Sequence, residues 1–430
     1  MDALARLLYA AAGQAARGAA AATPSGGGKL LRAVAARRGI RARYAAWARE
    51  RRDPSRPLLW MHAPSVGEGL QARPVLERFR QRRPELQLAY THFSPSAERF
   101  ARGLDVDFAD YLPFDTAADA RHALDALRPS ALVFSKLDVW PMLSTAAHRR
   151  GIPLGLVSAT LAAGSSRSRG VAARLLRQAY AALDLVGAID EADARRLVAL
   201  GVREHAITVT GDTRYDQVWA RAQAADRTGP LLAPLASDRP TLVAGSTWPA
   251  DERALLPAWV VLRRQLRGAR LVIAPHEPTS AHLTPVERWA SDTGLRLARL
   301  DAADATAADV ILVDRVGVLG DLYALADVAF VGGGFHAAGL HSVLEPAAFG
   351  APVLFGPRHT NSRDAGILIA AGGAVAAVDA SALATALIAW LGDLPTAAAA
   401  GAAARTVVES GLGAAERSYA LVEQLLNARG

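Results

Sequence analysis

The chain has 430 residues, which is too long for one ordinary hydrophobic core and predicts two domains. Hydrophobic residues make up 51% of the sequence, which excludes an intrinsically disordered chain. Cysteine is absent, so disulfides and cysteine-based metal or redox sites are excluded.

Positive charge is concentrated close to the N-terminus. The formal net charge is +8, and residues 29–52 alone carry nine Lys or Arg against one Glu. A basic block after an apolar start favours an anionic membrane surface, whereas a basic stripe along the whole chain would favour nucleic acid. Residues 1–22 are Ala-rich, but Arg6, Gln14 and Arg17 interrupt them, so they fit a spanning helix poorly, and they lack a convincing signal-peptide layout. Residues 1–52 are therefore predicted to associate with a membrane through an interfacial amphipathic helix. An ordinary surface helix packed on the first domain is the alternative.

Residues 53–220 are predicted to form a Rossmann-like domain. Short apolar runs alternate there with Arg- and Ala-rich amphipathic segments, which is typical of βαβ units and a parallel sheet. The runs are PLLWMHA, LQLAYTH, SALVFSK, IPLGLVSA and LDLVGAID.

Residues 221–240 interrupt this alternation with Pro, Gly and Ser and are predicted to be a linker. The pattern returns in PTLVAGS, ARLVIAP, ADVILVD, DVAFVGG and APVLFGP, which predicts a second Rossmann-like domain over residues 241–405. Residues 406–430 form a final predicted helix with no strand after it, free to dock back on the first domain. The fold class is therefore α/β, with two parallel sheets facing a central cleft, and ligands are expected beyond the carboxyl ends of the strands.

The first candidate site is the sequence HAPSVGEG, which ends at Gly69 and precedes a helix predicted over residues 70–80. Gly67 permits a tight turn, and Glu68 then lies near the helix N-terminus, where the helix dipole stabilises a carboxylate. Such a carboxylate can act as general base toward a sugar hydroxyl. The alternative is a structural Glu that satisfies backbone N–H groups at the helix start.

The second candidate site is VGGGFHAAGLHSVLEPAAFG, residues 331–350. A predicted strand leads into glycines and a helix starting near Ser342, a candidate N-cap. The glycines let a ligand approach the backbone, the helix N-terminus can bind phosphate, and Glu345 can accept hydrogen bonds from ribose hydroxyls. Because the glycines follow a late strand, this is not a dinucleotide fingerprint. A tight structural turn is the alternative.

The third candidate site is IAPHEPTS, where His276 and Glu277 follow a predicted strand. Short polar residues at such an edge commonly contact a nucleotide. One His beside one Glu lacks the spacing and the further ligands of a metal site.

The fourth candidate is a pair of cations, Lys136 in FSKLDVWP and Arg214 in TGDTRYD. Both lie at predicted strand ends of the first domain, where either could neutralise charge that develops on a phosphate leaving group. A solvated or salt-bridged surface cation is the alternative for each.

These pieces, in this order, resemble the 3-deoxy-manno-octulosonic acid (Kdo) transferases of lipopolysaccharide biosynthesis. The resemblance covers most of the chain, from about residue 57 to residue 372. It rests on HAPSVGEG, THFSPSAERF, YLPFD, VWP, VSATL, VTGDTRYD, VAGSTWPADE, ADVAFVGGGF, HSVLEPAAFGAPVLFGP and Asn361.

The resemblance implies a GT-B glycosyltransferase that transfers Kdo from CMP-Kdo to a lipid A precursor such as lipid IVA. It implies an inverting reaction without a covalent intermediate, at the cytoplasmic face of the inner membrane of a Gram-negative cell. By motif match, Glu68 would be the general base, and Lys136 and Arg214 would stabilise the transition state. The residues expected to contact CMP are His276, Glu277, Val316, Gly317, Val318, Leu319, Ser342, Val343, Leu344 and Glu345.

No metal or other cofactor is expected. CMP-Kdo carries one phosphate, so cationic side chains and a helix N-terminus can hold the leaving group without a divalent ion. No DxD motif is apparent at a strand end. Arg73, Arg167 and Arg169 are candidate contacts to acceptor phosphates. The expected partners are therefore the lipid A precursor, CMP-Kdo and an anionic membrane surface, with no nucleic acid.

The chain departs from the family pattern at several positions. Many members have E-T-E-L-W-P where this chain has K-L-D-V-W-P, which reverses the charge at Lys136. Arg214 replaces a Lys, PHEP replaces P-R-H-P-E-R, and HSVLE replaces H-N-P-L-E. We interpret these forms as the pattern of another branch of the family.

Two other functions are considered. A GT-B enzyme with another nucleotide sugar and lipid acceptor is the first, and competition between CMP and UDP would separate it. The second is a non-enzymatic membrane or nucleic-acid binder that uses the basic block. It predicts that Glu68 is dispensable and that binding falls steeply with salt.

Overall fold

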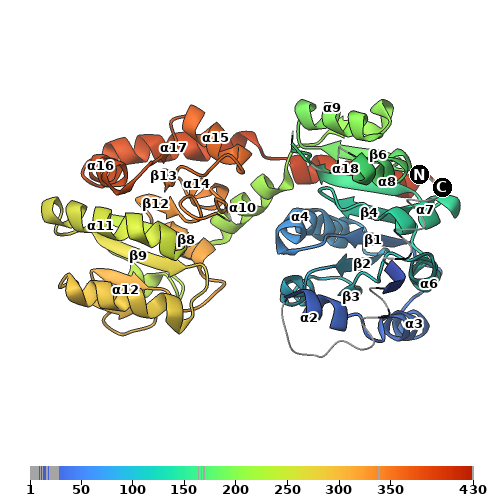
Figure 1. Cartoon of the computed structure of the whole chain (residues 1–430), viewed down its shortest axis with the longest axis horizontal. Helices are drawn as coiled ribbons and strands as arrows, with labels where there is room; N and C mark the ends of the chain where they lie inside the picture. Colours follow the sequence, from blue (N-terminus) through green and yellow to red (C-terminus); the bar gives the residue numbers. More distant parts are fainter. Residues whose placement is uncertain are drawn as a thin grey trace. The chain divides into compact units, whose positions relative to one another are not determined.

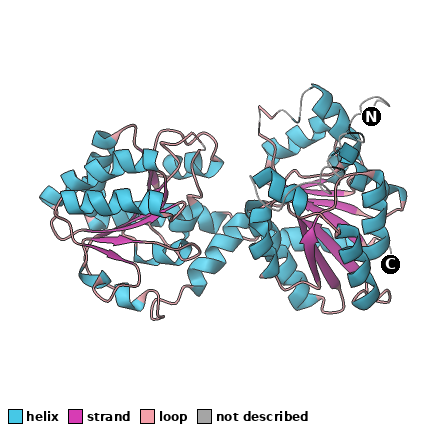
Figure 2. Ribbon diagram, turned by 60° about the horizontal axis from the view of Figure 1, so that its bottom comes forward, coloured by secondary structure: helices cyan, strands magenta, loops and turns pink. Residues whose placement is uncertain are grey.

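The computed structural model describes residues 9, 11, 13–15, 18, 29–162, 164–165, 167, 170–337 and 339–428. The chain forms two compact units (Figure 1). The first unit combines Met1–Gln217 with Leu412–Gly430, and the second is Val218–Gly411. Each unit holds one seven-stranded sheet, with all neighbouring strands parallel, between layers of helices (Figure 2). The predicted α/β fold with two parallel sheets is confirmed.

The sheet of the first unit has the strand order β3-β2-β1-β4-β5-β6-β7. Its strands are β1 (Leu58–His62), β2 (Gln87–His92), β3 (Phe108–Tyr111), β4 (Ala131–Ser135), β5 (Leu154–Ala159), β6 (Leu185–Ala188) and β7 (Ile207–Val209). The strands β1, β2, β4 and β5 are buried throughout because helices cover both faces of the sheet. The apolar runs of the sequence correspond to the interior strands.

Two layers of helices cover this sheet. The helical elements are α2 (Lys29–Ala35), α3 (Ile40–Glu50), α4 (Val66–Arg82), η1 (Pro95–Ala97), α5 (Glu98–Arg102), α6 (Ala117–Leu127), α7 (Pro141–Arg149), α8 (Gly170–Ala181), α9 (Glu191–Leu200), η3 (Glu204–Ala206), the start of α10 (Thr213–Ala224), and α18 (Ala414–Asn427). One core, with Tyr44 and Leu124, lies under α3 and α6 to α9. The other core, with Phe79 and Leu425, lies under α4, α5 and α18.

The helix α18 completes the first unit from the far end of the chain. Leu425 is buried in the core, and Gly155 on β5 leaves room for it, since a Cβ there would lie 2.5 Å from Leu425 Cδ1. The prediction of a single helix over residues 406–430 is wrong, because α17 (Leu394–Ser410) ends before α18 begins. Gly413 separates the two with a left-handed backbone (φ 86°), which ends the helical path.

The second unit repeats the architecture with the strand order β10-β11-β9-β8-β12-β13-β14. Its strands are β8 (Thr241–Thr247), β9 (Arg270–Pro275), β10 (Leu297–Arg299), β11 (Val310–Leu312), β12 (Val328–Val331), β13 (Val353–Phe355) and β14 (Ala374–Ala376). Its helices are the end of α10, η4 (Ala233–Leu235), α11 (Pro249–Gln265), α12 (Ser280–Asp292), η5 (Ala305–Ala307), α13 (Leu319–Leu322), η6 (Tyr323–Leu325), α14 (Leu344–Ala348), α15 (Arg363–Ala370), α16 (Ala380–Leu391) and α17.

Residues 221–240, predicted as a linker, belong to the second unit. They contain the end of α10 and the short turn η4. Leu232 and Leu235 are each 2% exposed and pack into the core of that unit with Val243. The Pro and Gly residues of this segment therefore mark turns within a packed segment.

Residues 29–52, predicted to contact an anionic membrane, pack on the first unit through several of their arginines. Arg37 is 3% exposed, donates to backbone carbonyls and lies over aromatic rings. Arg41 and Arg43 form ion pairs of 2.5 and 2.7 Å with aspartates of the unit. These guanidinium groups stabilise the first unit. The helix predicted within residues 1–22 lies largely outside the described residues.

In the described part of the chain, no single helix has both the length and the apolar character needed to cross a membrane. The segments Ala380–Leu391 and Leu394–Asn427 meet that criterion only together, as a pair bent by 101°. Their apolar side chains, such as Leu387 and Val422, are buried in the two units.

Candidate active site

The first unit places two predicted site residues at the switch point of its sheet. From β1 the chain proceeds to β2 on one side, and it later returns to β4 on the other side. The loops that follow β1 and β4 therefore diverge at the carboxyl edge, which is where ligands bind in such sheets. Glu68 follows β1, and Lys136 follows β4 directly.

Glu68 lies in the first turn of α4. The helix begins at Val66, four residues before the predicted start, because Ser65 has the extended backbone of an N-cap. One carboxylate oxygen lies 3.0 Å from Lys136 Nζ, and the other accepts a hydrogen bond from the Ser65 hydroxyl. The Glu68 side chain is 16% exposed, so it is sheltered but open to a ligand.

The surroundings keep the Glu68 carboxylate ionised. Burial by itself raises the pKa of this carboxyl group. The Lys136 ammonium and the hydrogen bond from Ser65 act in the opposite direction, and together they hold the pKa of Glu68 below its ordinary value. An ionised carboxylate at this edge can accept a proton.

Lys136 opens the loop between β4 and α7. Its backbone is left-handed (φ 66°), an uncommon conformation for a residue with a Cβ, and its side chain is 43% exposed. At the end of the same loop, Trp140 Nε1 lies 3.0 Å from His62 Nε2 and 3.0 Å from a carboxylate oxygen of Asp138. The loop is thereby held against the end of β1.

Arg214 lies in the first turn of α10, a few residues after β7. Its Nη2 lies 2.6 Å from a carboxylate oxygen of Asp212, which is 4% exposed. Burial raises the pKa of Asp212. The charge of Arg214 and the hydrogen bonds that it donates lower this pKa by a larger amount, so the pKa of Asp212 is below its ordinary value. Asp212 also accepts a hydrogen bond of 3.1 Å from Gln71, one turn after Glu68 on α4. Arg214 is thus connected to the helix that carries Glu68.

The second unit gathers aromatic and histidine rings at its own switch point. Trp248 follows β8, His276 follows β9, and both His336 and His341 follow β12. These rings lie close together because β8 is paired with both β9 and β12. The Trp248 ring stacks on His336 at 4.5 Å and on His276 at 4.6 Å. Trp248 Nε1 donates a 3.0 Å hydrogen bond to His341 Nε2. Burial lowers the pKa of His341 to about 4, with His276 and His336 adding to the effect, so His341 is neutral at pH 7.

Asp251 fixes the glycine-rich loop after β12. Its carboxylate is fully buried and accepts backbone N–H groups from Gly333 at 2.7 Å, Phe335 at 2.9 Å and Trp248 at 2.9 Å. Gly333 has a left-handed backbone (φ 94°), and a Cβ there would collide with the oxygen of Gly339. One carboxylate on α11 therefore determines the shape of two neighbouring loops. Sequence reasoning noted the motif STWPADE but gave no role to Asp251.

The predicted turn at residues 316–319 joins β11 to α13. Val316 is 62% exposed, and Gly317 is left-handed (φ 92°). Arg221, which sequence reasoning did not identify, donates to the Gly317 carbonyl at 3.3 Å and to both carboxylate oxygens of Asp321. Arg221 thus ties the end of α10 to this turn.

His276 and Glu277 lie at the carboxyl end of β9, both exposed, as predicted from the apolar run before them. Glu345 lies in the first turn of α14. Burial raises the pKa of Glu345, and the nearby Arg221 only partly opposes this. None of the described residues donates a hydrogen bond to the Glu345 carboxylate.

The prediction that Ser342 caps a helix is wrong. The helix α14 begins at Leu344, and Val343 occupies the N-cap position with a right-handed backbone (φ −90°, ψ −12°). Ser342 is exposed and lies one residue before the cap, so its hydroxyl makes no capping hydrogen bond. The helix is only five residues long, and its start could not be located from periodicity.

The arginines predicted to contact acceptor phosphates already have partners where they are described. Arg73 lies 3.8 Å from Glu77, and Arg167 donates to the Leu137 carbonyl at 2.7 Å. Arg169 lies outside the described residues. No group of three or more His, Cys, Asp or Glu side chains that could hold a metal ion occurs among the residues that the structure describes.

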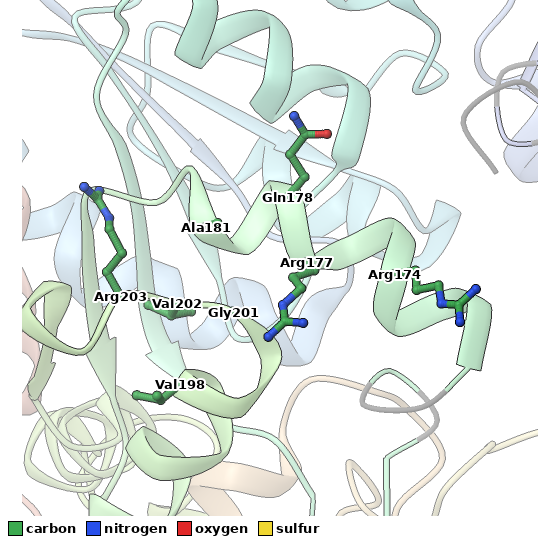
Figure 3. A pocket seen from close by; sticks show the side chains of 8 residues that line it. All are labelled: Arg174, Arg177, Gln178, Ala181, Val198, Gly201, Val202 and Arg203. Atoms are coloured by element: carbon green, nitrogen blue, oxygen red, sulfur yellow. The ribbon is translucent and has the colours of Figure 1, made fainter. Parts of the chain in front are cut away.

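A surface groove of about 830 Å³ lies between α8 and the end of α9 (Figure 3). It contains none of the predicted site residues, and its three arginines, Arg174, Arg177 and Arg203, point apart rather than toward one centre (Figure 3). Arg203 lies 3.3 Å from a carboxylate oxygen of Asp184. We assign no role in the reaction to this groove.

Solved structures with a similar fold include a UDP-N-acetylglucosamine 2-epimerase with a TM-score of 0.62, 17% identity, and coverage of 87% of this chain and 96% of that chain. The enzyme of that name from Neisseria meningitidis, bound to UDP-GlcNAc, gives a TM-score of 0.59 at 15% identity, covering 82% of this chain and 99% of its own. At such identities the likeness shows the fold alone, which is of the GT-B type.

Sequence comparison identifies the family. The family model described as 3-deoxy-D-manno-octulosonic-acid transferase (kdotransferase) matches residues 38–217. The 3-deoxy-D-manno-octulosonic acid transferase of Bordetella pertussis is 33% identical over 334 residues, covering 75% of this chain and 76% of its own length. That of Chlamydophila psittaci is 33% identical over 315 residues, covering 72% and 71%. This chain therefore belongs to the 3-deoxy-D-manno-octulosonic acid transferase family of glycosyltransferases.

Proposed function

We propose that this protein transfers Kdo from CMP-Kdo to a lipid A precursor of the lipid IVA type, with inversion at the anomeric carbon and Glu68 as general base. The coarser statement, a Kdo transferase of lipopolysaccharide biosynthesis, follows from the family. The observation that carries the finer proposal is the ionised Glu68 carboxylate beside Lys136 at a sheet switch point.

The proposed reaction is a single displacement. Glu68 takes the proton of an acceptor hydroxyl, and the hydroxyl oxygen forms a bond to the anomeric carbon of Kdo. The bond between that carbon and the phosphate oxygen breaks, and CMP leaves with the electron pair. One displacement inverts the anomeric configuration, and no second nucleophile is needed.

Charge on the departing phosphate would be balanced by cations, without a metal ion. Lys136 has an ammonium group that is 43% exposed, so it can donate to a ligand as well as to Glu68. The Arg214 charge is partly balanced by Asp212, so we propose that Arg214 acts mainly by orienting the phosphate. A positively charged pair is suited to the single phosphate of CMP.

The second unit is proposed to hold the donor. His276, Glu277 and the turn 316–319 follow neighbouring strands β9 and β11, and 342–345 follows β12. The glycine-rich loop held by Asp251 permits a ligand to approach its backbone. The Glu345 carboxylate, which receives no hydrogen bond from the described residues, is suited to accept hydrogen bonds from ribose hydroxyls.

The acceptor is proposed to reach the first unit from the cytoplasmic face of the inner membrane. The basic segment 29–52 retains exposed cations, including Arg32 and Arg51, that can lie against anionic lipid. Each such residue near an anionic surface contributes about 1 kcal/mol.

The proposal is tested by supplying the purified protein with a tetraacylated lipid A precursor and either CMP-Kdo, generated in situ, or a set of UDP-sugars. We expect a Kdo-containing product that CMP inhibits and UDP does not. Product from a UDP-sugar alone would instead establish a GT-B enzyme of another specificity. A chain that binds lipid, forms no product with any donor and loses binding in salt would be a non-enzymatic binder.

Replacing Lys136 is expected to move the acid limb of the pH profile. Burial raises the pKa of Glu68, and in Lys136→Met only the Ser65 hydrogen bond and the local backbone still oppose it. Because the base must be ionised, the pH at which kcat/KM falls should rise in this variant. Lys136→Arg keeps the charge and should leave the limb in place. An unmoved limb in Lys136→Met would show that Lys136 does not set the ionisation of Glu68.

A further inference from the structure

One buried carboxylate outside the proposed reaction connects two distant parts of the first unit. Asp115 lies in the loop between β3 and α6 and is 7% exposed. Its carboxylate accepts the backbone N–H groups of Met142 at 2.9 Å and Leu143 at 2.8 Å. It also accepts the hydroxyl of Tyr9 at 2.8 Å.

Asp115 caps the N-terminus of α7 from outside the helix. The residue at the N-cap position is Trp140, whose side chain makes no capping hydrogen bond, and Pro141 follows it. The amides of Met142 and Leu143 would otherwise lack acceptors, because the first amides of a helix have no partner within it. Asp115 therefore holds the start of α7 in place.

The start of α7 is also the end of the loop that Lys136 opens. The loop has only five residues, from Lys136 to Trp140, between β4 and α7. Lys136 contacts the Glu68 carboxylate at its beginning, and Trp140 contacts His62 at its end. A displacement of α7 therefore shifts the group that keeps Glu68 ionised.

Tyr9 belongs to the N-terminal residues that are predicted from the sequence to associate with a membrane. A second contact supports its placement: Gly13, one helical turn later, lies so close that a Cβ on it would be 3.2 Å from Thr116 Cγ2 and 3.5 Å from the Asp115 carbonyl oxygen. Tyr9 and Gly13 are four residues apart and share one face of a helix. That face contacts Asp115 and Thr116.

We propose that Tyr9 and Asp115 are positioning residues for the transfer reaction, so that the N-terminal segment forms part of the active-site scaffold and is more than an anchor. The inference rests on the proposed function, because Glu68 and Lys136 are the groups being positioned. Tyr9 acts by holding Asp115, and Asp115 acts by holding the start of α7.

The Tyr9 hydroxyl acts on the start of α7 through the ionisation of Asp115. Burial raises the pKa of Asp115 to about 6, and the negative charge of Asp138 adds to the increase. The hydrogen bonds from the Met142 amide, Tyr9 and the Leu143 amide lower it. Without the Tyr9 hydroxyl, the pKa of Asp115 rises further, and a larger fraction of the carboxyl group is protonated at neutral pH. A protonated carboxyl is a weaker acceptor for the amides of α7.

The test is Tyr9→Phe in the full chain, assayed in detergent micelles that contain the lipid acceptor, so that membrane attachment does not limit the rate. We expect kcat at pH 7 to fall about three- to tenfold, which is the size of effect that the net contribution of one typical hydrogen bond gives. The loss should diminish at pH 8.5, where Asp115 is ionised again, and the KM for CMP-Kdo should stay constant. An unchanged kcat at every pH would overturn the proposal.

The matched control is Tyr44→Phe. Tyr44 is fully buried in the same unit and donates a 2.9 Å hydrogen bond to the Tyr111 carbonyl, away from α7. It should reduce thermal stability without a pH-dependent change in kcat. If Tyr44→Phe reproduces the pH-dependent loss, the effect of Tyr9→Phe is one of general stability and the proposal fails.

A second readout does not need activity. Tyr9→Phe should increase hydrogen exchange at the amides of Met142 and Leu143, whereas the amides of β1 should keep their protection. If the wild-type protein transfers no Kdo but these two amides lose protection, the proposed function fails and the link between Tyr9 and α7 stands. Unchanged exchange at both amides would remove the link itself.

Discussion

Glu68→Gln is expected to lower kcat by about 10²- to 10⁴-fold, the range that general-base groups contribute. Glutamine keeps the size of the side chain and can still accept from Ser65, but it cannot take a proton from the acceptor hydroxyl. The binding of CMP-Kdo should change little, because the donor is proposed to bind the second unit. Steady-state kinetics with purified, folded variant protein provides the measurement.

The control for Glu68→Gln is Glu77→Gln on the same helix, α4. The Glu77 side chain is 59% exposed, and its nearest cation, Arg73, is 3.8 Å away. It should keep wild-type rates. A Glu68→Gln enzyme within threefold of wild type would remove Glu68 as the base, although the family would stand. A loss in both variants would point instead to damage of α4.

Asp251→Asn is expected to weaken donor binding about 10- to 100-fold. The buried carboxylate accepts three backbone N–H groups, and an amide has one oxygen and an NH₂ group that would face at least one of those donors. The glycine-rich loop after β12 should then lose its fixed shape beside Trp248. Calorimetric titration with CMP measures the loss directly, and kcat at saturating donor should fall less than the affinity.

A suitable control is Asp292→Asn, since Asp292 is exposed at the end of α12 and carries no structural carboxylate role among the contacts described. It should bind CMP as tightly as wild type. Unchanged CMP affinity in a folded Asp251→Asn protein would mean that the loop after β12 does not form the donor site. If Asp251→Asn lost CMP binding and also much of its thermal stability, general unfolding could explain the loss. Glu345→Gln would then test the donor site separately, because it changes the proposed ribose contact without disturbing the loop.

The apolar pattern predicted the interior of each sheet and missed its edges. All ten predicted runs correspond to strands, and the four strands without a prediction are β3, β7, β10 and β14. Each of these is an edge strand of three or four residues. An edge strand has one strand neighbour and partial exposure, so its sequence lacks the continuous apolar run that burial on both faces requires.

Site residues were predictable where a single strand end positioned them. Glu68, Lys136 and His276 each follow an apolar run, and the structure places each after its strand. The contact between Glu68 and Lys136 joins residues 68 positions apart, and only the pairing of β1 with β4 brings them together. Position 136, where many family members have a Glu, carries a Lys in this chain, and that Lys forms an ion pair with Glu68.

The ring cluster around Trp248 could not be derived from the sequence. Its members follow β8, β9 and β12, so the cluster depends on a strand order that places β8 between β9 and β12. The spacing of STWPADE, PHEP and GGGFHAAGLH along the chain carries no information about that order. The cluster becomes predictable only when the strand order is known, because that order shows which motifs follow neighbouring strands.

The position of α18 has a consequence for synthesis of the protein on the ribosome. The second unit, Val218–Gly411, is complete in the nascent chain before α18 has been made. The first unit begins synthesis earlier but lacks Val422 and Leu425, which fill the core beneath β5. The half of the protein translated first must therefore mature after the second unit, with an open apolar surface until α18 has been made, and loss of α18 would damage the N-terminal half of the molecule.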